Sequence, residues 1–289
     1  MKKYLLQYHF WVLGILTGFL SSCNTKHRIW VGPQNQQKIF NQPYGENKKQ
    51  VMDIFLPANY HKESPTVILV HGGGWKFGRK ENMIMIQKFL FENNIPSLNI
   101  NYRLVSKNKK ITYKQQLEDI GLAISAFNKL TPKAHLFPNN YILLGESAGA
   151  HLALLYGYQN PEKIKKIISL SGPSDFYTEN YTKSFYSYYS SPVIETVVGE
   201  KFKRKNLSEK FMEASPIANV SHVPTLIFQG GNDVLVNKKQ GFKLDSVLTE
   251  KNIPHQLIYM KNSGHAPRFF SKYKRNHIIL PEILNWIKK

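Results

Sequence analysis

The chain has a single cysteine and no internal repeat or low-complexity tract. Cys23 is the only thiol among 289 residues, so a disulfide within the chain is excluded. Hydrophobic residues make up 42% of the sequence, which is enough for one sizeable core. We therefore expect a single α/β domain.

Acidic residues are also scarce, because 19 Asp and Glu oppose 39 Lys and Arg and leave a formal charge of +20. Basic clusters occur at 107–110, 201–205 and 272–275. Such a surface favours anionic partners. The clusters are scattered, however, and no nucleic-acid motif accompanies them. We interpret the charge as a general preference for lysine and expect no nucleic-acid partner.

The one hydrophobic run outside the predicted core is at the N-terminus. It extends from about Phe10 to Leu20, follows two lysines and ends in Leu-Ser-Ser-Cys. This run is too short to span a bilayer comfortably. It resembles a bacterial lipoprotein signal, which implies cleavage of residues 1–22 and lipidation of Cys23. A plain cleaved signal and an uncleaved anchor are the alternatives.

That resemblance implies an exported lipoprotein, bound to a membrane through its lipid and facing the periplasm or the cell surface. Residues 23–45 are polar and are predicted to form a tether between the lipid and the domain. The folded domain is expected over residues 46–289. Its oligomeric state is left open.

Predicted strands and helices alternate through most of this domain, which indicates a mostly parallel central sheet with helices on both faces. An antiparallel strand at 51–57 is expected to begin it. The further strands are predicted at 66–71, 95–102, 141–145, 166–172, 225–230 and 255–260. The helices are predicted at 81–93, 114–130, 148–158, 238–251 and 278–288.

Residues 174–215 interrupt this alternation, because they are longer than a usual α/β connection. The segment is rich in aromatic residues, including Phe176, Tyr181 and Tyr188. We interpret it as a cap inserted over one end of the sheet. Its rings either face a substrate or pack the cap against the body.

One serine stands between two glycines after a predicted strand and before a predicted helix. Residues 145–149 read Gly-Glu-Ser-Ala-Gly, the G-x-S-x-G pattern. A serine at such a sharp turn is strained, and side chains at Gly145 and Gly149 would clash. The pattern predicts Ser147 as a nucleophile, and a structural turn is the alternative.

A serine nucleophile needs a base and an acid that orients the base. Asp233 follows the strand predicted at 225–230, and His265 lies in the loop after 255–260. The order Ser, Asp, His is the one expected for this kind of fold. We predict that His265 accepts the proton of Ser147 and that Asp233 fixes the imidazole tautomer.

Other acids and histidines are weaker candidates. Asp175 follows another strand and is a rival for Asp233, either capping the chain or lining the cap. His151 is predicted to be buried and structural, and His255 and His277 are predicted to lie on the surface or in packing contacts.

Three successive glycines after the strand at 66–70 supply a place for an oxyanion. The segment His71-Gly72-Gly73-Gly74 lets the backbone approach a substrate carbonyl. The predicted donors are the N–H groups of Gly73, Gly74 and Ala148, with His71 and Gly72 supporting the loop.

Together these motifs resemble the α/β-hydrolase fold, and within it the carboxylesterases with an HGGG oxyanion loop. From about Tyr44 onward, "VILVHGGGWKFG", "GESAGAHLALL", "TLIFQGGNDVLV" and "SGHA" follow that family's order. The likeness is to the acetylxylan and feruloyl esterase branch, with hormone-sensitive-lipase-like and kynurenine-formamidase-like relatives. It implies a serine esterase without metal or cofactor, in which water hydrolyses an acyl-enzyme on Ser147.

Three functions are compatible with the sequence. The first is an esterase acting on short acyl or aromatic acyl groups, including carbohydrate-linked ones. The second is an amide hydrolase, formamidase-like or peptidase-like, because the same three residues serve both reactions. The third is a lipid-anchored binding protein without catalysis, which the intact motifs disfavour.

The lipoprotein signal yields a test. Cys23→Ala is expected to release the exported protein from membranes, because the residue that would carry the lipid is lost. Fractionation of cells by centrifugation and immunoblotting measures this. Retention of the variant in the membrane fraction would instead indicate an uncleaved hydrophobic anchor.

Overall fold

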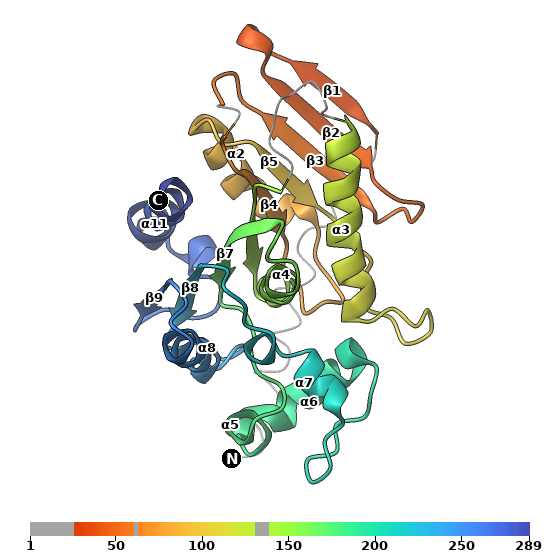
Figure 1. Ribbon diagram of the computed structural model, residues 1–289, viewed down its shortest axis with the longest axis vertical. Helices are drawn as coiled ribbons and strands as arrows, with labels where there is room; N and C mark the ends of the chain where they lie inside the picture. The colour runs from red at the N-terminus through yellow and green to blue at the C-terminus, as the bar shows by residue number, and fades with distance from the viewer. Residues whose placement is uncertain (1–25, 61–62, 131–138) are drawn as a thin grey trace, which may run out of the picture.

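One nine-stranded sheet organises the described part of the chain (Figure 1). The structure, a computed structural model, describes residues 26–60, 63–130 and 139–289. The predicted signal segment and Cys23 lie outside these residues. The strands are β1 Arg28–Val31, β2 Gln37–Pro43, β3 Val51–Leu56, β4 Thr66–Val70, β5 Ser97–Ile100, β6 Tyr141–Glu146, β7 Ile164–Leu170, β8 Thr225–Gly230 and β9 His255–Met260.

The strand order is β1-β2-β3-β5-β4-β6-β7-β8-β9. Pairs from β1 to β5 are antiparallel, whereas those from β5 through β4 to β9 are parallel. In β4, Val67 and Leu69 face one core and Ile68 and Val70 face the other. This burial on both faces explains the continuous apolar run and confirms the predicted mostly parallel sheet.

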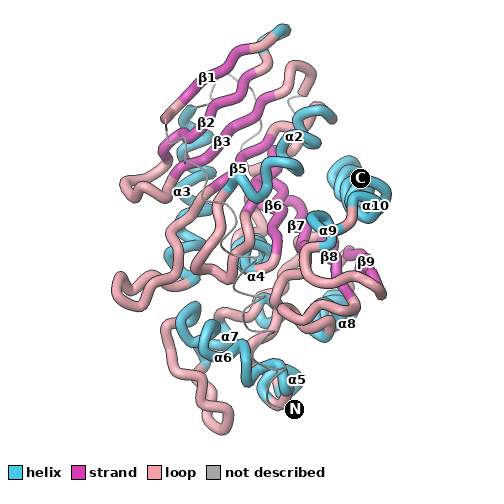
Figure 2. Tube along the Cα trace, turned by 180° about the vertical axis from the view of Figure 1, so that it is seen from behind, coloured by secondary structure: helices cyan, strands magenta, loops and turns pink. Residues whose placement is uncertain are grey.

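Helices cover both faces of the sheet, as expected (Figures 1 and 2). On one face lie α2 Ile84–Glu92 and α11 Leu280–Lys288, preceded by η2 Lys80–Met83 and η4 Arg275–Ile279. On the other lie α3 Tyr113–Leu130, α4 Ala148–Gln159 and α8 Lys239–Glu250. The predicted helices are confirmed, with ends that differ by a few residues. Among the described helices, none combines the length and apolar character needed to cross a bilayer.

The segment predicted as a cap contains three short helices at one end of the molecule (Figure 1). They are α5 Glu179–Thr182, α6 Phe185–Val198 and α7 Glu209–Glu213. Gln240 of α8 holds the start of this segment, because its Oε1 accepts the Ser174 and Asp175 N–H groups at 2.7 Å each. The cap is thus fixed to the body by buried hydrogen bonds.

The prediction of a flexible tether over residues 23–45 is wrong for residues 28–43, which form β1, η1 Pro33–Asn35 and β2. Ile39 of β2 pairs with Ile54 of β3, and the Phe40 ring packs edge-on against Phe55 at 5.5 Å. Polar residues dominate β2, and both strands lie at the outer edge of the sheet, where one side stays solvated. Composition alone therefore indicated a linker.

The pairing of β2 with β3 predicts that a chain beginning at Tyr44 is less stable than one beginning at Asn24. We expect its free energy of unfolding to fall by at least about 3 kcal/mol, since the packing on Phe55 is lost. The uncovered β3 edge should also promote self-association. Urea unfolding and light scattering measure both effects. Two chains of equal stability would mean that residues 28–43 act as a tether after all.

Candidate active site

Ser147 occupies a strained turn between β6 and α4. Its backbone has φ 53° and ψ −120°, outside the regions that non-glycine residues ordinarily adopt. Its N–H donates to the Leu170 carbonyl at 2.8 Å. A Cβ at Gly149 would lie 2.1 Å from the Val70 carbonyl oxygen, so only glycine lets α4 begin there. The turn therefore has the geometry of a nucleophile elbow.

Asp233 and His265 are joined by a hydrogen bond. His265 Nδ1 lies 2.8 Å from Asp233 Oδ2, and the Asp233 carboxylate is fully buried. Asp233 Oδ1 accepts the N–H groups of Leu235 and Val236 at 2.9 and 2.8 Å, which fixes the carboxylate. Because a carboxylate only accepts, Nδ1 carries a proton, and in the neutral ring the lone pair is then on Nε2. The imidazole is thus in the tautomer that a base requires.

Ser147, Asp233 and His265 follow β6, β8 and β9. Because these strands are parallel, all three residues lie at the carboxyl ends of the strands, on the same side of the sheet. Within the described residues, Ser147 Oγ makes no hydrogen bond to His265. Such bonds are often loose in unliganded sites and tighten when substrate binds. The catalytic roles of the three residues remain predictions.

The predicted oxyanion loop lies against the elbow. A Cβ at Gly72 would be 3.3 Å from Ser147 Cβ. Gly73 and Gly74 have φ values of +125° and +56°, which only glycine adopts readily. Within the described residues, the N–H groups of Gly73, Gly74 and Ala148 donate to no other group. They are therefore available to a substrate oxygen.

His71 supports this loop from inside the protein. Its Nδ1 donates to the Gly72 carbonyl at 2.7 Å, and its ring stacks on Tyr102 at 4.2 Å. The Tyr102 hydroxyl donates to the His71 carbonyl at 2.7 Å. Complete burial lowers the pKa of His71 to about 4. His71 is therefore a neutral structural residue, as its sequence context suggested.

His151 links the loop to the cap. Trp75 Nε1 donates to His151 Nδ1 at 3.1 Å, so the proton is on Nε2, which donates to the Ala214 carbonyl at 2.8 Å. Complete burial lowers the pKa of His151 to about 4, against the smaller opposing effect of the Ala214 carbonyl. The prediction of a buried, structural histidine agrees with these contacts.

The cap aromatics divide into two groups. Phe176 and Tyr181 are buried and pack edge-on at 5.9 Å. Phe185 is 74% exposed. Tyr186 lies between these extremes: it is half-buried and packs edge-on against Tyr181 at 6.5 Å. Burial raises its pKa, and the charges of Tyr181 and Asp233 add to the rise.

The rival acid and histidines have other roles. Asp175 Oδ1 accepts hydrogen bonds from the N–H groups of Tyr177 and Thr178, so it fixes the backbone at the start of the cap segment. His255 Nδ1 contacts the Ile253 carbonyl at 2.6 Å, and His277 stacks on Tyr273. None of the three contacts the candidate triad.

A buried ion pair that the sequence motifs did not predict joins Glu146 and Arg268, whose closest atoms are 2.6 Å apart. The only hint of this pair in the sequence is where its members stand. Glu146 directly precedes the predicted nucleophile, and Arg268 follows the predicted base by three residues. Opposite charges beside two such residues indicate a pair only once the fold brings them together.

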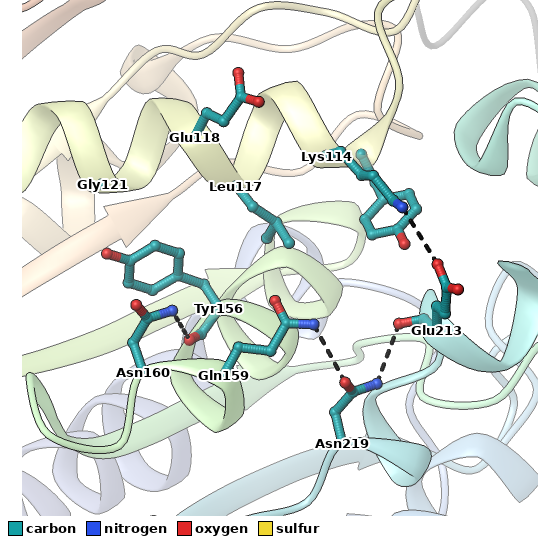
Figure 3. Close-up of a pocket in the computed structure, with 10 residues that line it drawn as sticks. Lys114, Leu117, Glu118, Gly121, Tyr156, Gln159, Asn160, Glu213 and Asn219 are labelled. Atoms are coloured by element: carbon teal, nitrogen blue, oxygen red, sulfur yellow. Dashed lines mark hydrogen bonds and ion pairs between the residues drawn. The ribbon is translucent and has the colours of Figure 1, made fainter.

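A separate hollow of about 530 Å³ lies between α3, α4 and the end of the cap (Figure 3). Its polar groups bind one another: Lys114 pairs with Glu213 at 3.2 Å, and Gln159 donates to Asn219 at 3.2 Å. No residue of the candidate triad lines it. The described residues also contain no group of three or more His, Cys, Asp or Glu side chains placed to hold a metal ion.

A comparison with protein families agrees with this geometry, because the model of the family BD-FAE matches residues 52–248, more than half of the chain. The chain belongs to the BD-FAE family. Kynurenine formamidase of Danio rerio is 24% identical to this BD-FAE chain and aligns with 88% of it and 83% of its own length. Isoprenylcysteine alpha-carbonyl methylesterase of Arabidopsis thaliana is 23% identical over 78% of the chain, which spans only 56% of that enzyme.

Solved structures show the same fold. A truncated carbohydrate esterase from gut microbiota has a TM-score of 0.69 at 19% identity and covers 93% of this chain and 99% of its own. An acetyl ester-xyloside bifunctional hydrolase from Caldicellulosiruptor lactoaceticus has a TM-score of 0.65 at 18% identity, covering 85% and 94%. This BD-FAE chain therefore has the α/β-hydrolase fold.

The burial of His151 predicts a pH-dependent stability. Because its pKa falls from 6.5 to about 4 on folding, the unfolded chain binds more protons between these pH values. The free energy of unfolding therefore decreases as the pH falls through this window. His151→Gln keeps a donor and an acceptor but does not titrate there. Between pH 6.5 and 5, the wild type should lose about 1.6 kcal/mol more than the variant in urea unfolding. Equal losses would contradict a neutral buried His151.

Proposed function

We propose that this protein is a serine carboxylesterase that hydrolyses short-chain acyl (acetyl) or aromatic acyl esters, including carbohydrate-linked ones. The observation that carries the proposal is the 2.8 Å hydrogen bond between His265 Nδ1 and Asp233 Oδ2. It lies at the end of the parallel strands that also bears the Ser147 elbow and the glycine loop. These neighbouring positions support the roles of base, nucleophile and oxyanion donors that we propose for them.

In the proposed reaction, Ser147 Oγ attacks the ester carbonyl carbon while His265 Nε2 takes its proton. The imidazolium is stabilised by the buried Asp233 carboxylate. The oxyanion accepts hydrogen bonds from Gly73, Gly74 and Ala148. The C–O bond breaks, and His265 returns the proton to the departing alcohol. Water then attacks the acyl-enzyme with His265 again as base, releasing the acid and restoring Ser147.

Two observations support an ester of a carbohydrate as the substrate. The similar solved structures include a carbohydrate esterase and an acetyl ester-xyloside hydrolase. In this chain, the cap carries the half-buried Tyr186, whose pKa is raised by burial and by the charges of Tyr181 and Asp233. Aromatic faces are large apolar surfaces with a polar edge, which suits both a sugar ring and an aromatic acyl group.

An amide substrate is the second candidate, and the match to kynurenine formamidase over 88% of the chain favours it. The same three residues would attack a formamide. A non-catalytic binding protein would have no need of a fixed Asp–His pair. Turnover of an N-formyl arylamine faster than of any ester would replace our proposal with the amide hydrolase.

We further propose that the domain is held to a membrane through lipidated Cys23. Because β1 begins at Arg28, four residues, 24–27, separate the two, and an extended chain of that length reaches about 14 Å. β1 itself exposes Ile29 and Val31, at 60% and 63%. An anchor at Cys23 would keep this apolar sheet edge close to the bilayer surface.

Ser147→Ala is expected to lower kcat on p-nitrophenyl acetate by at least about 10⁴-fold and leave folding intact, since the nucleophile acts as a unit with its base. The preferred acyl and alcohol groups are ranked by comparing the rates of the wild type on five substrates: the p-nitrophenyl esters of acetate, butyrate and octanoate, methyl ferulate and acetylated xylan. The chain from Asn24 onward is used, with circular dichroism as the control for folding. A folded variant that retains turnover would remove Ser147 from the mechanism.

A further inference from the structure

The residues next to the proposed nucleophile and base form a two-pronged ion pair. Glu146 immediately precedes Ser147 at the end of β6, and Arg268 lies in α9 Pro267–Phe270. Arg268 Nε donates to Glu146 Oε1 at 2.6 Å, and Arg268 Nη2 donates to Glu146 Oε2 at 2.7 Å. Arg268 is 1% exposed and Glu146 is 5% exposed. The pair thus joins the elbow directly to the loop that carries His265.

The same guanidinium also reaches the segment that follows the oxyanion loop. Arg268 Nη2 donates to the Asn82 carbonyl at 3.0 Å and lies 3.3 Å from Met83 Sδ. Asn82 and Met83 belong to η2, which begins at Lys80, soon after the glycine loop. One side chain therefore joins the end of the strand before Ser147, the segment that carries His265 and the turn that follows the glycine loop.

The loop that carries His265 needs such a contact. Ala266 has φ 51° and ψ 55°, a left-handed conformation that a non-glycine residue keeps only when its surroundings hold it. Before His265, the loop is fixed by the Asn232 N–H, which donates to the Ser263 carbonyl at 2.9 Å. After His265, Phe269 and Phe270 are exposed. Arg268 is the residue of α9 whose polar side chain attaches this half of the loop to the core.

Stability alone is a weak reason for this arrangement. Two charges buried together gain little over apolar residues of the same volume, because each loses its hydration. A planar guanidinium facing a carboxylate does, however, fix distance and orientation through two parallel hydrogen bonds. The pair therefore supplies geometric definition between Ser147 and His265.

We propose that Arg268 and Glu146 are positioning residues that set the His265 imidazole against Ser147 Oγ. The proposal rests on the proposed esterase function, since it assigns the pair's effect to that reaction. Neither side chain contacts the substrate in this scheme. A lysine at position 268 would keep the positive charge but could not form the two parallel hydrogen bonds of the guanidinium fork. The orientation of the His265 loop relative to Ser147 would therefore be lost.

The chain provides a matched control for loss of an arginine fork. Arg103 Nε donates to Asp119 Oδ1 at 2.8 Å and to Oδ2 at 3.1 Å, and Asp119 is fully buried. Asp119 lies on α3, and neither residue contacts Ser147, Asp233 or His265. Arg103→Lys therefore removes a comparable contact outside the candidate site.

The experiment compares Arg268→Lys, Arg103→Lys and the double variant Glu146→Leu/Arg268→Met, using kcat and KM on p-nitrophenyl acetate together with Tm. Arg268→Lys should lose at least about tenfold in kcat with KM changed less than about threefold, because small misplacements slow the chemical step. Arg103→Lys should lower Tm but keep kcat within about twofold. The double variant should regain Tm, since no buried charge lacks a partner, and still show the low kcat.

A double variant with both Tm and kcat of the wild type would overturn the proposal, because the pair would then be only structural. So would a folded Arg268→Lys with unchanged kcat. If the wild type hydrolyses no ester, the esterase proposal fails separately. Positioning is then read from the low-field proton resonance of His265 Nδ1–H. It should be sharp in the wild type and Arg103→Lys and broadened in Arg268→Lys, and an unchanged resonance in Arg268→Lys would sink the proposal.

Discussion

The close approach of the first turn of α4 to the end of β4 is the constraint on which the rest of the site depends. A Cβ at Gly149 would lie 2.1 Å from the Val70 carbonyl and 2.4 Å from that of His71. This approach forces Ser147 into its left-handed turn and places the glycine loop beside it. The N-terminus of α4, whose first N–H groups have no partner within the helix, follows Ser147 directly. Backbone packing therefore sets how the Ser147 turn and the glycine loop lie against each other.

Buried ion pairs hold the surrounding segments. Lys80 contacts Asp53 at 2.9 Å, and burial raises the pKa of Asp53 although Lys80 opposes that rise. Arg268 contacts Glu146 in a second pair. Each pair joins residues far apart in the chain, so each fixes how separate segments meet. Burying such a pair costs the hydration free energy of both charges. Its advantage over apolar packing is that its hydrogen bonds fix the orientation of the two segments.

The cap is attached through aromatic and hydrogen-bonded contacts to the same segments. The Trp75 ring packs edge-on against Phe176 of the cap at 6.2 Å, and Lys76 Nζ lies 3.4 Å from Thr196 Oγ1 of α6. The loop that offers N–H groups and the cap over it are thus one packed unit. A substrate that contacts the cap is therefore placed relative to the oxyanion donors, and this coupling links specificity to rate in the proposed esterase.

The sequence by itself determined the parallel part of the sheet and its flanking helices, because apolar runs are local patterns, and it made Ser147, Asp233 and His265 the candidate triad. It did not reveal β1, which pairs with β2, or β2, which pairs with β3. Nor could it reveal the hydrogen bond between Asp233 and His265 or the contact of Arg268 with Glu146, 122 residues away. Tertiary structure decided these, since side chains distant in sequence meet only when parallel strands bring their carboxyl ends to one edge.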